Sequence, residues 1–315
     1  AWERPFSAKL HFARVAPGAT AAKYNFARQV RSQVKLGNEE EWDKCVPEWK
    51  FGNEKIEESA TMQSGHSSRA RYNGRVQLVV FDWAGTTIDF GCCAPAGAFA
   101  ELFRRHGIEA SIAEARGPMG MHKRDHIRAM LAMPSIAAQW QAKHGHASTP
   151  EELEALFEEF IPMQIEALPA FCNLIPGVIE TAQALRAQGI KLGGTTGYNT
   201  EMMKICMDAA RAAGYAPDFS VAGSEVPTGR PAPWMAIKVA MELGVYPFES
   251  IVKVGDTVTD VEEGLNGGMW AVGVTVTGNE VGLNAAEWAA LPAAEQDALN
   301  AGAREKLFAA GAHYV

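Results

Sequence analysis

Residues 78–89 have the sequence LVVFDWAGTTID, a short apolar run followed by a carboxylate and a small, hydroxyl-rich segment. An apolar run that contains β-branched residues is typical of a buried parallel strand. Open α/β sheets bind their ligands at the carboxyl ends of such strands. Asp82, which ends the run, is therefore a candidate functional residue. The alternative that this stretch leaves open is an aspartate that only caps the next turn.

The composition of the chain is that of an ordinary soluble globular protein. It has 315 residues, of which 47% are hydrophobic and 21% are charged, enough for one large domain or two moderate ones. No run approaches the roughly 18 apolar residues that a membrane span needs, so we expect no span. The five cysteines are an odd number without metal-ligand spacing, which indicates reduced thiols in an intracellular protein.

Charge is distributed unevenly along the chain. Residues 1–75 contain 13 basic and 9 acidic residues, a net charge of +4. Because the whole chain carries −8, the remainder carries −12. An acidic main body argues against a general nucleic-acid-binding protein. We therefore expect no nucleic acid partner.

Residues 1–75 differ from the rest of the chain and are interpreted as an N-terminal extension, or arm. Within it, residues 20–35 place apolar side chains at near-helical spacing with basic residues between them, which predicts a basic amphipathic helix. Three interpretations stay open for the arm: an organellar (mitochondrial) targeting segment, a docking segment for a protein partner, and a decoration that only packs on its own protein. Without a targeting role, we expect a cytoplasmic protein.

Strand and helix patterns alternate in the second half of the chain. Strands are predicted over 190–195, 219–222, 251–254 and 270–276. Helices are predicted over 177–188, 200–213, 233–243, 258–267, 285–299 and 303–310. Strands that alternate with helices of about ten or more residues predict an α/β fold with a parallel, doubly wound sheet.

The segment between the first strand and this alternation is almost entirely helical in pattern. After a helix around Phe99, which stops near Gly107, further helices are predicted over 112–116, 125–133, 136–143 and 150–165. We therefore expect a hydrolase core, formed by residues 76–91 and 173–315, into which residues 92–172 are inserted as a helical cap.

Further strand ends carry groups suited to phosphate chemistry. Asp256 follows a second apolar run, and with Asp82 it offers the carboxylate pair that Mg²⁺ prefers beside water and phosphate oxygens. Thr196 and Gly197 offer a hydroxyl and backbone N–H groups to an anion. Arg230 offers a permanent cation to a phosphoryl group. These elements in this order are a more specific signal than any one of them.

This set resembles the haloacid dehalogenase superfamily over residues 76–315, including the inserted cap. The resemblance implies that Asp82 attacks phosphorus as a nucleophile. It also implies that Mg²⁺ is held by Asp82, Asp256 and the backbone carbonyl of Ala84, with Asp260 orienting the metal's waters or Thr257. The chain departs from the superfamily at Ala84, where the usual aspartate protonates an oxygen leaving group. A leaving group that needs no proton on oxygen would explain the change.

A phosphonate has such a leaving group, because its C–P bond breaks to a carbanion that must be stabilised as an enamine. An imine provides that stabilisation, and an imine needs a lysine. Residues 117–126, GPMGMHKRDH, supply Lys123 at the start of a predicted cap helix. A position that is partly desolvated and close to other cations would lower the pKa of this lysine and favour its neutral, nucleophilic form.

Several segments together are similar to the phosphonoacetaldehyde hydrolase family. They are DWAGTT at 82–87, GPMGMHKRDH at 117–126, TTGY at 195–198, GRPAPWM at 229–235 and VGDT at 254–257. The resemblance implies a Schiff base between Lys123 and a small phosphonate aldehyde, and a homodimer that pairs through the cap. The residues that it places at the substrate are Thr196, Gly197 and Arg230, which bind the phosphoryl oxygens, and Met119, His126, Cys92 and Tyr198.

Two alternatives remain. A protein with this fold could serve as a structural or accessory subunit of a larger assembly, docked through the arm. It could also be a phosphatase of the same superfamily that acts on phosphate esters, which Ala84 disfavours. Retention of the full set of chemical groups favours the enzyme, because a structural role would not need them all.

Overall fold

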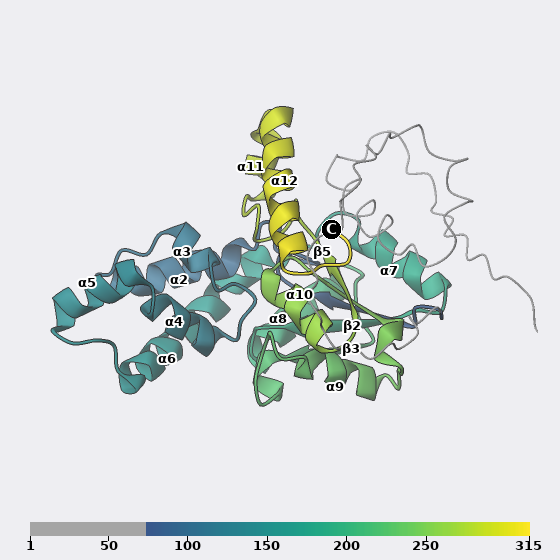
Figure 1. Ribbon diagram of the computed structural model, residues 1–315, viewed down its shortest axis with the longest axis horizontal. Helices are drawn as coiled ribbons and strands as arrows, with labels where there is room; N and C mark the ends of the chain where they lie inside the picture. The colour runs from purple at the N-terminus through teal and green to yellow at the C-terminus, as the bar shows by residue number, and fades with distance from the viewer. Residues whose placement is uncertain (1–73) are drawn as a thin grey trace, which may run out of the picture.

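The computed structural model describes residues 74–315 (Figure 1). The predicted basic helix over 20–35 and the rest of the arm up to residue 73 lie outside the described residues. None of the helices within 74–315 combines the length and apolar character that crossing a bilayer would require.

A five-stranded parallel sheet forms the centre of the core, in the order β3-β2-β1-β4-β5. Its strands are β1 (Leu78–Asp82), β2 (Lys191–Thr196), β3 (Phe219–Ala222), β4 (Ile251–Gly255) and β5 (Trp270–Gly273). The central strand β1 pairs with β2 on one side and with β4 on the other. The predicted α/β class and parallel sheet are confirmed.

Both faces of the sheet are covered, as the continuous burial of β1 requires. Because side chains alternate along a strand, Val79 and Phe81 belong to one apolar cluster and Leu78 and Val80 to another. The core helices are α7 (Val178–Ala187), α8 (Thr200–Ala212), α9 (Trp234–Glu242), α10 (Val258–Asn266), α11 (Ala285–Ala290) and α12 (Ala293–Ala309). Helix α9 packs across β1, β2 and β3, and α10 packs on β4 and β5.

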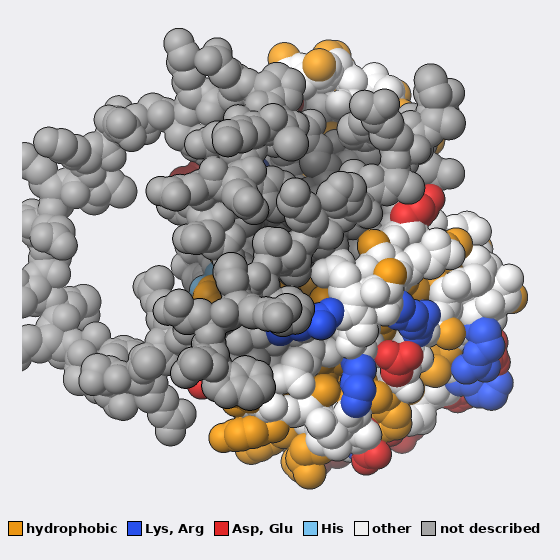
Figure 2. All heavy atoms as spheres, turned by 90° about the vertical axis from the view of Figure 1, so that its right-hand side faces the viewer, with side chains coloured by type: hydrophobic (Ala, Val, Ile, Leu, Met, Phe, Trp, Pro, Cys, Tyr) orange, Lys and Arg blue, Asp and Glu red, His pale blue; other side chains and the backbone are white. Residues whose placement is uncertain are grey.

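The surface of the core mixes charges of both signs. On the face drawn in Figure 2, basic and acidic side chains lie among apolar ones over the described residues. Short 3₁₀ turns complete the core at η3 (Gly223–Glu225) and η4 (Phe248–Ser250).

The segment between β1 and α7 forms a separate group of helices beside the sheet (Figure 1). They are α2 (Cys93–Arg105), α3 (Ile112–Arg116), α4 (Lys123–Leu131), α5 (Pro134–His144) and α6 (Pro150–Ala167), followed by the 3₁₀ turn η2 (Leu168–Phe171). Two of them begin at capping boxes, at Ser111 and Thr149, which satisfy the first N–H groups of the helix. The predicted helical cap is confirmed.

Three predicted elements were wrong in extent. The strand expected to reach residue 276 ends at Gly273, although the residues after it remain buried. The helices expected over 285–299 and 303–310 are instead divided at Leu291 and Pro292. A proline has no N–H to donate and disfavours helix at the preceding residue, and it therefore places the break before 293 and leaves α12 continuous beyond 299.

Candidate active site

Sheet topology brings the predicted strand-end residues to one edge. Asp82 ends β1 and is paired in register with Thr195 of β2, next to Thr196. Asp256 directly follows β4, the other neighbour of β1. Because all three strands are parallel, their carboxyl ends lie at the same edge of the sheet.

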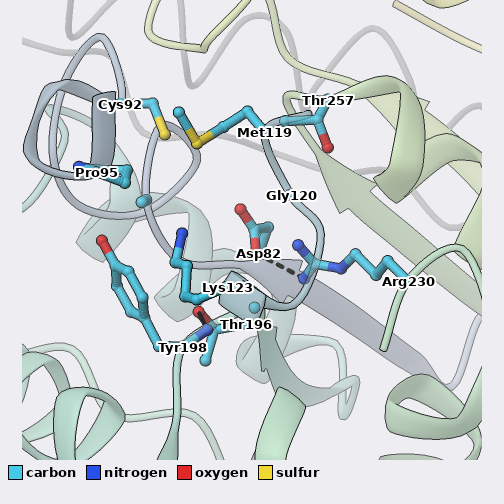
Figure 3. A pocket seen from close by; sticks show the side chains of 12 residues that line it. Asp82, Cys92, Pro95, Met119, Gly120, Lys123, Thr196, Tyr198, Arg230 and Thr257 are labelled. Atoms are coloured by element: carbon cyan, nitrogen blue, oxygen red, sulfur yellow. Dashed lines mark hydrogen bonds and ion pairs between the residues drawn. The ribbon is translucent and has the colours of Figure 1, made fainter. Parts of the chain in front are cut away.

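A cavity of about 280 Å³, including open solvent at its mouth, lies at this edge beneath the cap. Nine of the predicted site residues line it: Asp82, Ala84, Cys92, Met119, Lys123, Thr196, Gly197, Tyr198 and Arg230. Lys123 and Tyr198 lie on one side, Arg230 lies on the other, and Asp82 is between them (Figure 3). Groups from the core and from the cap therefore face one another across a space suited to a small molecule.

Arg230 is buried and is bound by carboxylates on three sides. Its Nη2 donates to Oδ1 of Asp82 at 2.6 Å and to Oγ1 of Thr195 at 2.8 Å. Its Nε donates to Oε2 of Glu263 at 2.9 Å, and Nη1 lies 3.1 Å from Oδ1 of Asp260. Because Glu263 and Asp260 fix two edges of the planar guanidinium, the remaining Nη2 points at Asp82.

A second buried cation completes this network. Lys253, in the middle of β4, places Nζ 2.6 Å from Oδ1 of Asp260 and 3.5 Å from Oε2 of Glu263. Burial raises the pKa of Asp260, but Arg230 and Lys253 outweigh that effect and hold it below its usual value. Asp260 is therefore anionic and paired with both cations. Its Oδ2 also accepts a hydrogen bond from Oγ1 of Thr257 at 2.6 Å.

Three carboxylates form an acidic cluster at the base of the cavity. One oxygen from each of Asp82, Asp256 and Asp260 lies within 4.8 Å of the others. Burial raises the pKa of Asp256 well above its usual value, and the neighbouring Asp82 and Asp260 raise it further. Burial likewise raises the pKa of Asp82, which Arg230 partly offsets. Crowded, buried carboxylate oxygens are the donor set that a hard divalent cation such as Mg²⁺ takes up.

Asp256 is held in place by two donors. Oγ1 of Thr86 donates to its Oδ1 at 2.9 Å, and the backbone N–H of Asn279 donates to its Oδ2 at 2.8 Å. These bonds fix the carboxylate plane relative to Asp82. Asp256 itself does not line the cavity, but one of its carboxylate oxygens lies within 4.8 Å of an oxygen of Asp82, which does.

Lys123 occupies a very different environment on the cap side. It is the first residue of α4, is only 4% exposed, and within residues 74–315 forms no salt bridge. Its Nζ lies 4.9 Å from the ring centre of Tyr198 and 5.4 Å from that of Phe99. Burial lowers its pKa to about 8. A substantial fraction of the amine is therefore neutral near physiological pH.

The loop before Lys123 lies directly on the core. Met119 is buried in the cavity wall, and its carbonyl accepts a hydrogen bond from Oγ1 of Thr259 at 3.3 Å. A Cβ at Gly197 would lie 2.5 Å from the carbonyl oxygen of Met121. Gly197 is thus required for close approach of the cap, in addition to any role of its N–H group toward an anion.

Cys92 and Tyr198 complete the wall near the lysine. Cys92 has left-handed backbone geometry (φ 50°) at the start of α2. Burial raises the pKa of its thiol well above the usual value, so the sulfur is a protonated wall group at neutral pH. The Tyr198 hydroxyl is buried without a hydrogen-bond partner among the described residues.

His126 does not line the cavity. Its ring stacks on Phe99 with a centroid distance of 3.7 Å, and Nε2 lies 2.9 Å from the carbonyl oxygen of Ala115. Burial lowers its pKa well below the usual value. This placement supports the wall that carries Lys123, whereas the predicted contact with substrate stays a prediction.

Several residues of the site were not predicted from the sequence. Glu263 binds Arg230, Lys253 pairs with Asp260 and Glu263, Asn279 holds Asp256, and Pro95 and Gly120 line the cavity. A signal existed for Lys253, because a charged residue inside an otherwise apolar strand needs a buried partner. Glu263 lies three residues after Asp260 on α10, which places the two on one face of the helix.

Comparisons with known proteins identify the family of the chain. Residues 76–268 match the family model described as haloacid dehalogenase-like hydrolase. A phosphonoacetaldehyde hydrolase of Nitratidesulfovibrio vulgaris is 46% identical over 244 residues, which are 78% of this chain and 87% of that protein. One of Bacillus cereus is 48% identical over 198 residues, 63% of this chain and 75% of the relative.

A solved structure shows the same arrangement of the chain. The crystal structure of a phosphonoacetaldehyde hydrolase-like protein from Oleispira antarctica has a TM-score of 0.76 and 47% sequence identity, covering 79% of this chain and 91% of the other. The fold, the sequence relatives and the family model agree with one another. The chain belongs to the phosphonoacetaldehyde hydrolases, enzymes of the haloacid dehalogenase-like hydrolase family.

Proposed function

We propose that the chain hydrolyses the C–P bond of phosphonoacetaldehyde to acetaldehyde and phosphate, through a Schiff base on Lys123 and an aspartyl phosphate on Asp82. The observation that carries the proposal is a buried lysine that forms no salt bridge within residues 74–315 and shares a cavity with a carboxylate held by an arginine. Imine formation with an aldehyde needs the lysine, and phosphoryl transfer needs the carboxylate and the arginine.

Lys123 begins the reaction. Its neutral Nζ adds to the aldehyde carbon, and loss of water with uptake of one proton from solvent gives a protonated imine. The imine withdraws electrons from the adjacent carbon, which bears the phosphorus. The pKa of about 8 leaves enough neutral amine for the addition, while the apolar faces of Phe99 and Tyr198 limit access of water.

Asp82 then receives the phosphoryl group. Its carboxylate oxygen attacks phosphorus, the C–P bond breaks, and the electron pair enters the imine to form an enamine. Thr196, Gly197 and Arg230 bind the phosphoryl oxygens as negative charge is redistributed. Asp82, Asp256 and the Ala84 carbonyl would hold Mg²⁺, with Asp260 behind them, and the ion would neutralise charge on the phosphoryl group.

Two hydrolytic steps complete the cycle. Water attacks phosphorus of the aspartyl phosphate and releases phosphate. The enamine takes up a proton at carbon, and water releases acetaldehyde from Lys123. Ala84 fits this sequence because the departing carbon needs no acid at that position. For the same reason, a phosphatase acting on phosphate esters is disfavoured.

The remaining proposals concern location and assembly. We retain the family-based expectation of an intracellular homodimer that pairs through the cap, which native mass measurement would test. The alternative of a purely structural subunit is not favoured, since the chain belongs to an enzyme family and keeps its chemical groups together. The relatives do not support an organellar role for the arm, and a partner for residues 1–75 stays a prediction.

The deciding experiment separates the two halves of the chemistry. The protein is incubated with phosphonoacetaldehyde and Mg²⁺, and the imine is reduced with borohydride before peptide mapping. We expect phosphate release and an adduct on Lys123 in the unmodified chain. Asp82→Asn should retain the adduct and lose phosphate release, whereas Lys123→Met should lose both. Absence of phosphate release and of any adduct on Lys123 in the unmodified chain would overturn the proposal.

A further inference from the structure

The side chain of Arg116, the last residue of cap helix α3, extends out of the cap and is bound by the core. Its Nη1 donates to the carbonyl oxygen of Gly91 at 2.7 Å and to Oδ1 of Asn279 at 3.1 Å. Its Nη2 donates to the carbonyl oxygen of Gly282 at 2.8 Å. Three separate segments therefore meet at one guanidinium: the linker that enters the cap, the cap itself, and the core loop that follows β5.

Asn279 makes this contact reciprocal and links it to the acidic cluster. Its Nδ2 donates to the carbonyl oxygen of Arg116 at 3.2 Å. Its backbone N–H donates to Oδ2 of Asp256 at 2.8 Å, and the residue is only 6% exposed. The side chain of Asn279 thus binds the cap while its backbone binds the core carboxylate.

Arg116 lies seven residues before Lys123, and the loop between them rests on the core. Oγ1 of Thr259 donates to the carbonyl oxygen of Met119 in this loop. At its other end, a Cβ on Gly229 would lie 3.1 Å from Cβ of His122, the residue before Lys123. Fixing Arg116 therefore fixes one end of the short segment that carries the lysine over Asp82.

We propose that Arg116 is a positioning residue that latches the cap to the core through Asn279 and Gly282, in the arrangement that places Lys123 opposite Asp82. Arginine suits this role because its planar fork of donors can bind several carbonyl oxygens at once. Neither Arg116 nor Asn279 lines the cavity, so their effect on chemistry passes through placement of the cap. The kinetic part of this inference rests on the proposed function, and the structural part does not.

The structural part is tested by hydrogen exchange on the full chain. Arg116→Gln keeps most of the side-chain length but removes the charge and the fork. We expect exchange in residues 117–122 to become about tenfold faster, with the strands of the core unchanged, because the segment opens locally. Arg128→Gln is the matched control, since Arg128 is a cap arginine that pairs with Asp125 at the surface. Unchanged exchange in the Arg116 variant would overturn the latch.

The kinetic part is tested by borohydride trapping on Lys123. Displacement of a reacting group by about 1 Å can cost about a hundredfold in rate. We expect a loss of that order in Arg116→Gln, recovery of part of it in Arg116→Lys, and no change in Arg128→Gln. Inhibition by inorganic phosphate, which probes the core half alone, should stay within about twofold. Equal losses in trapping and in phosphate binding would indicate general damage and contradict a positioning role.

A double-mutant cycle gives an independent check from the core side. Asn279→Ala removes the side-chain contact but keeps the backbone N–H that binds Asp256. If Asn279 acts through its contact with Arg116, the rate of trapping in the double variant should fall no further than in Arg116→Gln alone. Additive losses would contradict the latch. If the unmodified chain shows no trapping at all, the proposed function fails, whereas the hydrogen-exchange result still decides the latch.

Discussion

The core side of the cavity is crowded with ionised groups, whereas the cap side presents one lysine among apolar side chains. On the core side, Arg230 and Lys253 are interleaved with the carboxylates of Asp82, Asp260 and Glu263. On the cap side, the described neighbours of the Lys123 ammonium include the rings of Phe99 and Tyr198.

Under the proposed mechanism, the difference follows from the step that each half performs. A phosphoryl group is anionic throughout the reaction, so the core needs permanent charges fixed before substrate arrives. An amine is nucleophilic only when it is neutral, so the cap must lower the pKa of Lys123 by desolvation. A carboxylate beside Lys123 would stabilise its charged form, whereas loss of a cation from the core would leave anions uncompensated. Substitutions on the core side should therefore impair stability and phosphate release, whereas substitutions on the cap side should change the pH dependence of imine formation.

The largest effect is expected from Arg230→Met. The variant leaves Asp82, Asp260 and Glu263 without the cation that contacts all three. Removal of one partner of a buried ion pair typically costs about 3–5 kcal/mol of unfolding free energy, and loss of an arginine that contacts a transferring phosphoryl group costs about 10³-fold or more in rate. Chemical denaturation and phosphate-release assays measure the two losses. Borohydride trapping on Lys123 should fall much less, and an equal fall would contradict separate roles for the two halves.

Lys253→Met should give the next largest effect, and we expect it mainly on the free energy of unfolding. Methionine has a similar length but leaves Asp260 and Glu263 short of one cation, so we expect a loss of about 3 kcal/mol. Lys204→Met is the matched control, because Lys204 pairs with Asp208 at the surface, where such a pair contributes about 1 kcal/mol or less. Denaturant unfolding of both variants measures the contrast. Similar losses would show that burial of the Lys253 pair has no special weight.

The pH dependence of trapping tests the cap side. Because the pKa of Lys123 is lowered to about 8, the neutral fraction, and with it the rate of imine formation, should rise as pH increases through 8. Cys92→Asp places a carboxylate among the groups that influence Lys123, which should raise its pKa and move this rise upward by about one pH unit or more. Cys92→Asn is the control, since it has the same shape without charge. Aspartate and asparagine both tolerate the left-handed backbone conformation at position 92.

The outcome that would contradict this account is a rise that stays, in both Cys92 variants, at the pH found for the unmodified chain. That result would mean that the pH dependence of trapping does not report the ionisation of Lys123. A rise that moves equally in Asp and Asn variants would point to a change of shape in the cavity wall.

The sequence predicts the core fold well because its signals are local. The apolar run before Asp82 and the repeated run before Asp256 each specify a buried strand, and topology alone then brings their carboxylates to one edge. The break near the C-terminus was misplaced because the alanine-rich pattern around 285–299 is helical on both sides of Pro292. In that segment a single backbone constraint overrides the side-chain periodicity.

The contacts that orient the site residues were not predicted, because they join distant segments of the chain. Arg230 meets Asp82 across 148 positions of the sequence, and Arg116 meets Asn279 across 163. No local pattern indicates that Arg230 points at Asp82, or that His126 turns its ring to Phe99 behind the cavity. Strand-end residues can be predicted from sequence, whereas the side chains that orient them depend on packing between elements.

The smallest effect is expected at the outer end of the cap, where α6 begins (Figure 1). Oγ1 of Thr149 accepts a hydrogen bond from the N–H of Glu152, and the Glu152 carboxylate accepts one from the N–H of Thr149. Thr149→Ala should lower the unfolding free energy by about 1 kcal/mol, and Thr149→Ser should not, because serine keeps the capping oxygen. Trapping on Lys123 and phosphate release should stay within about twofold in both variants, because the core contacts that place Lys123 are made by Arg116 and by the loop that follows it. A clear loss of trapping in the alanine variant, measured where the protein remains folded, would mean that internal stability of the cap controls the lysine, and that docking through Arg116 does not act alone.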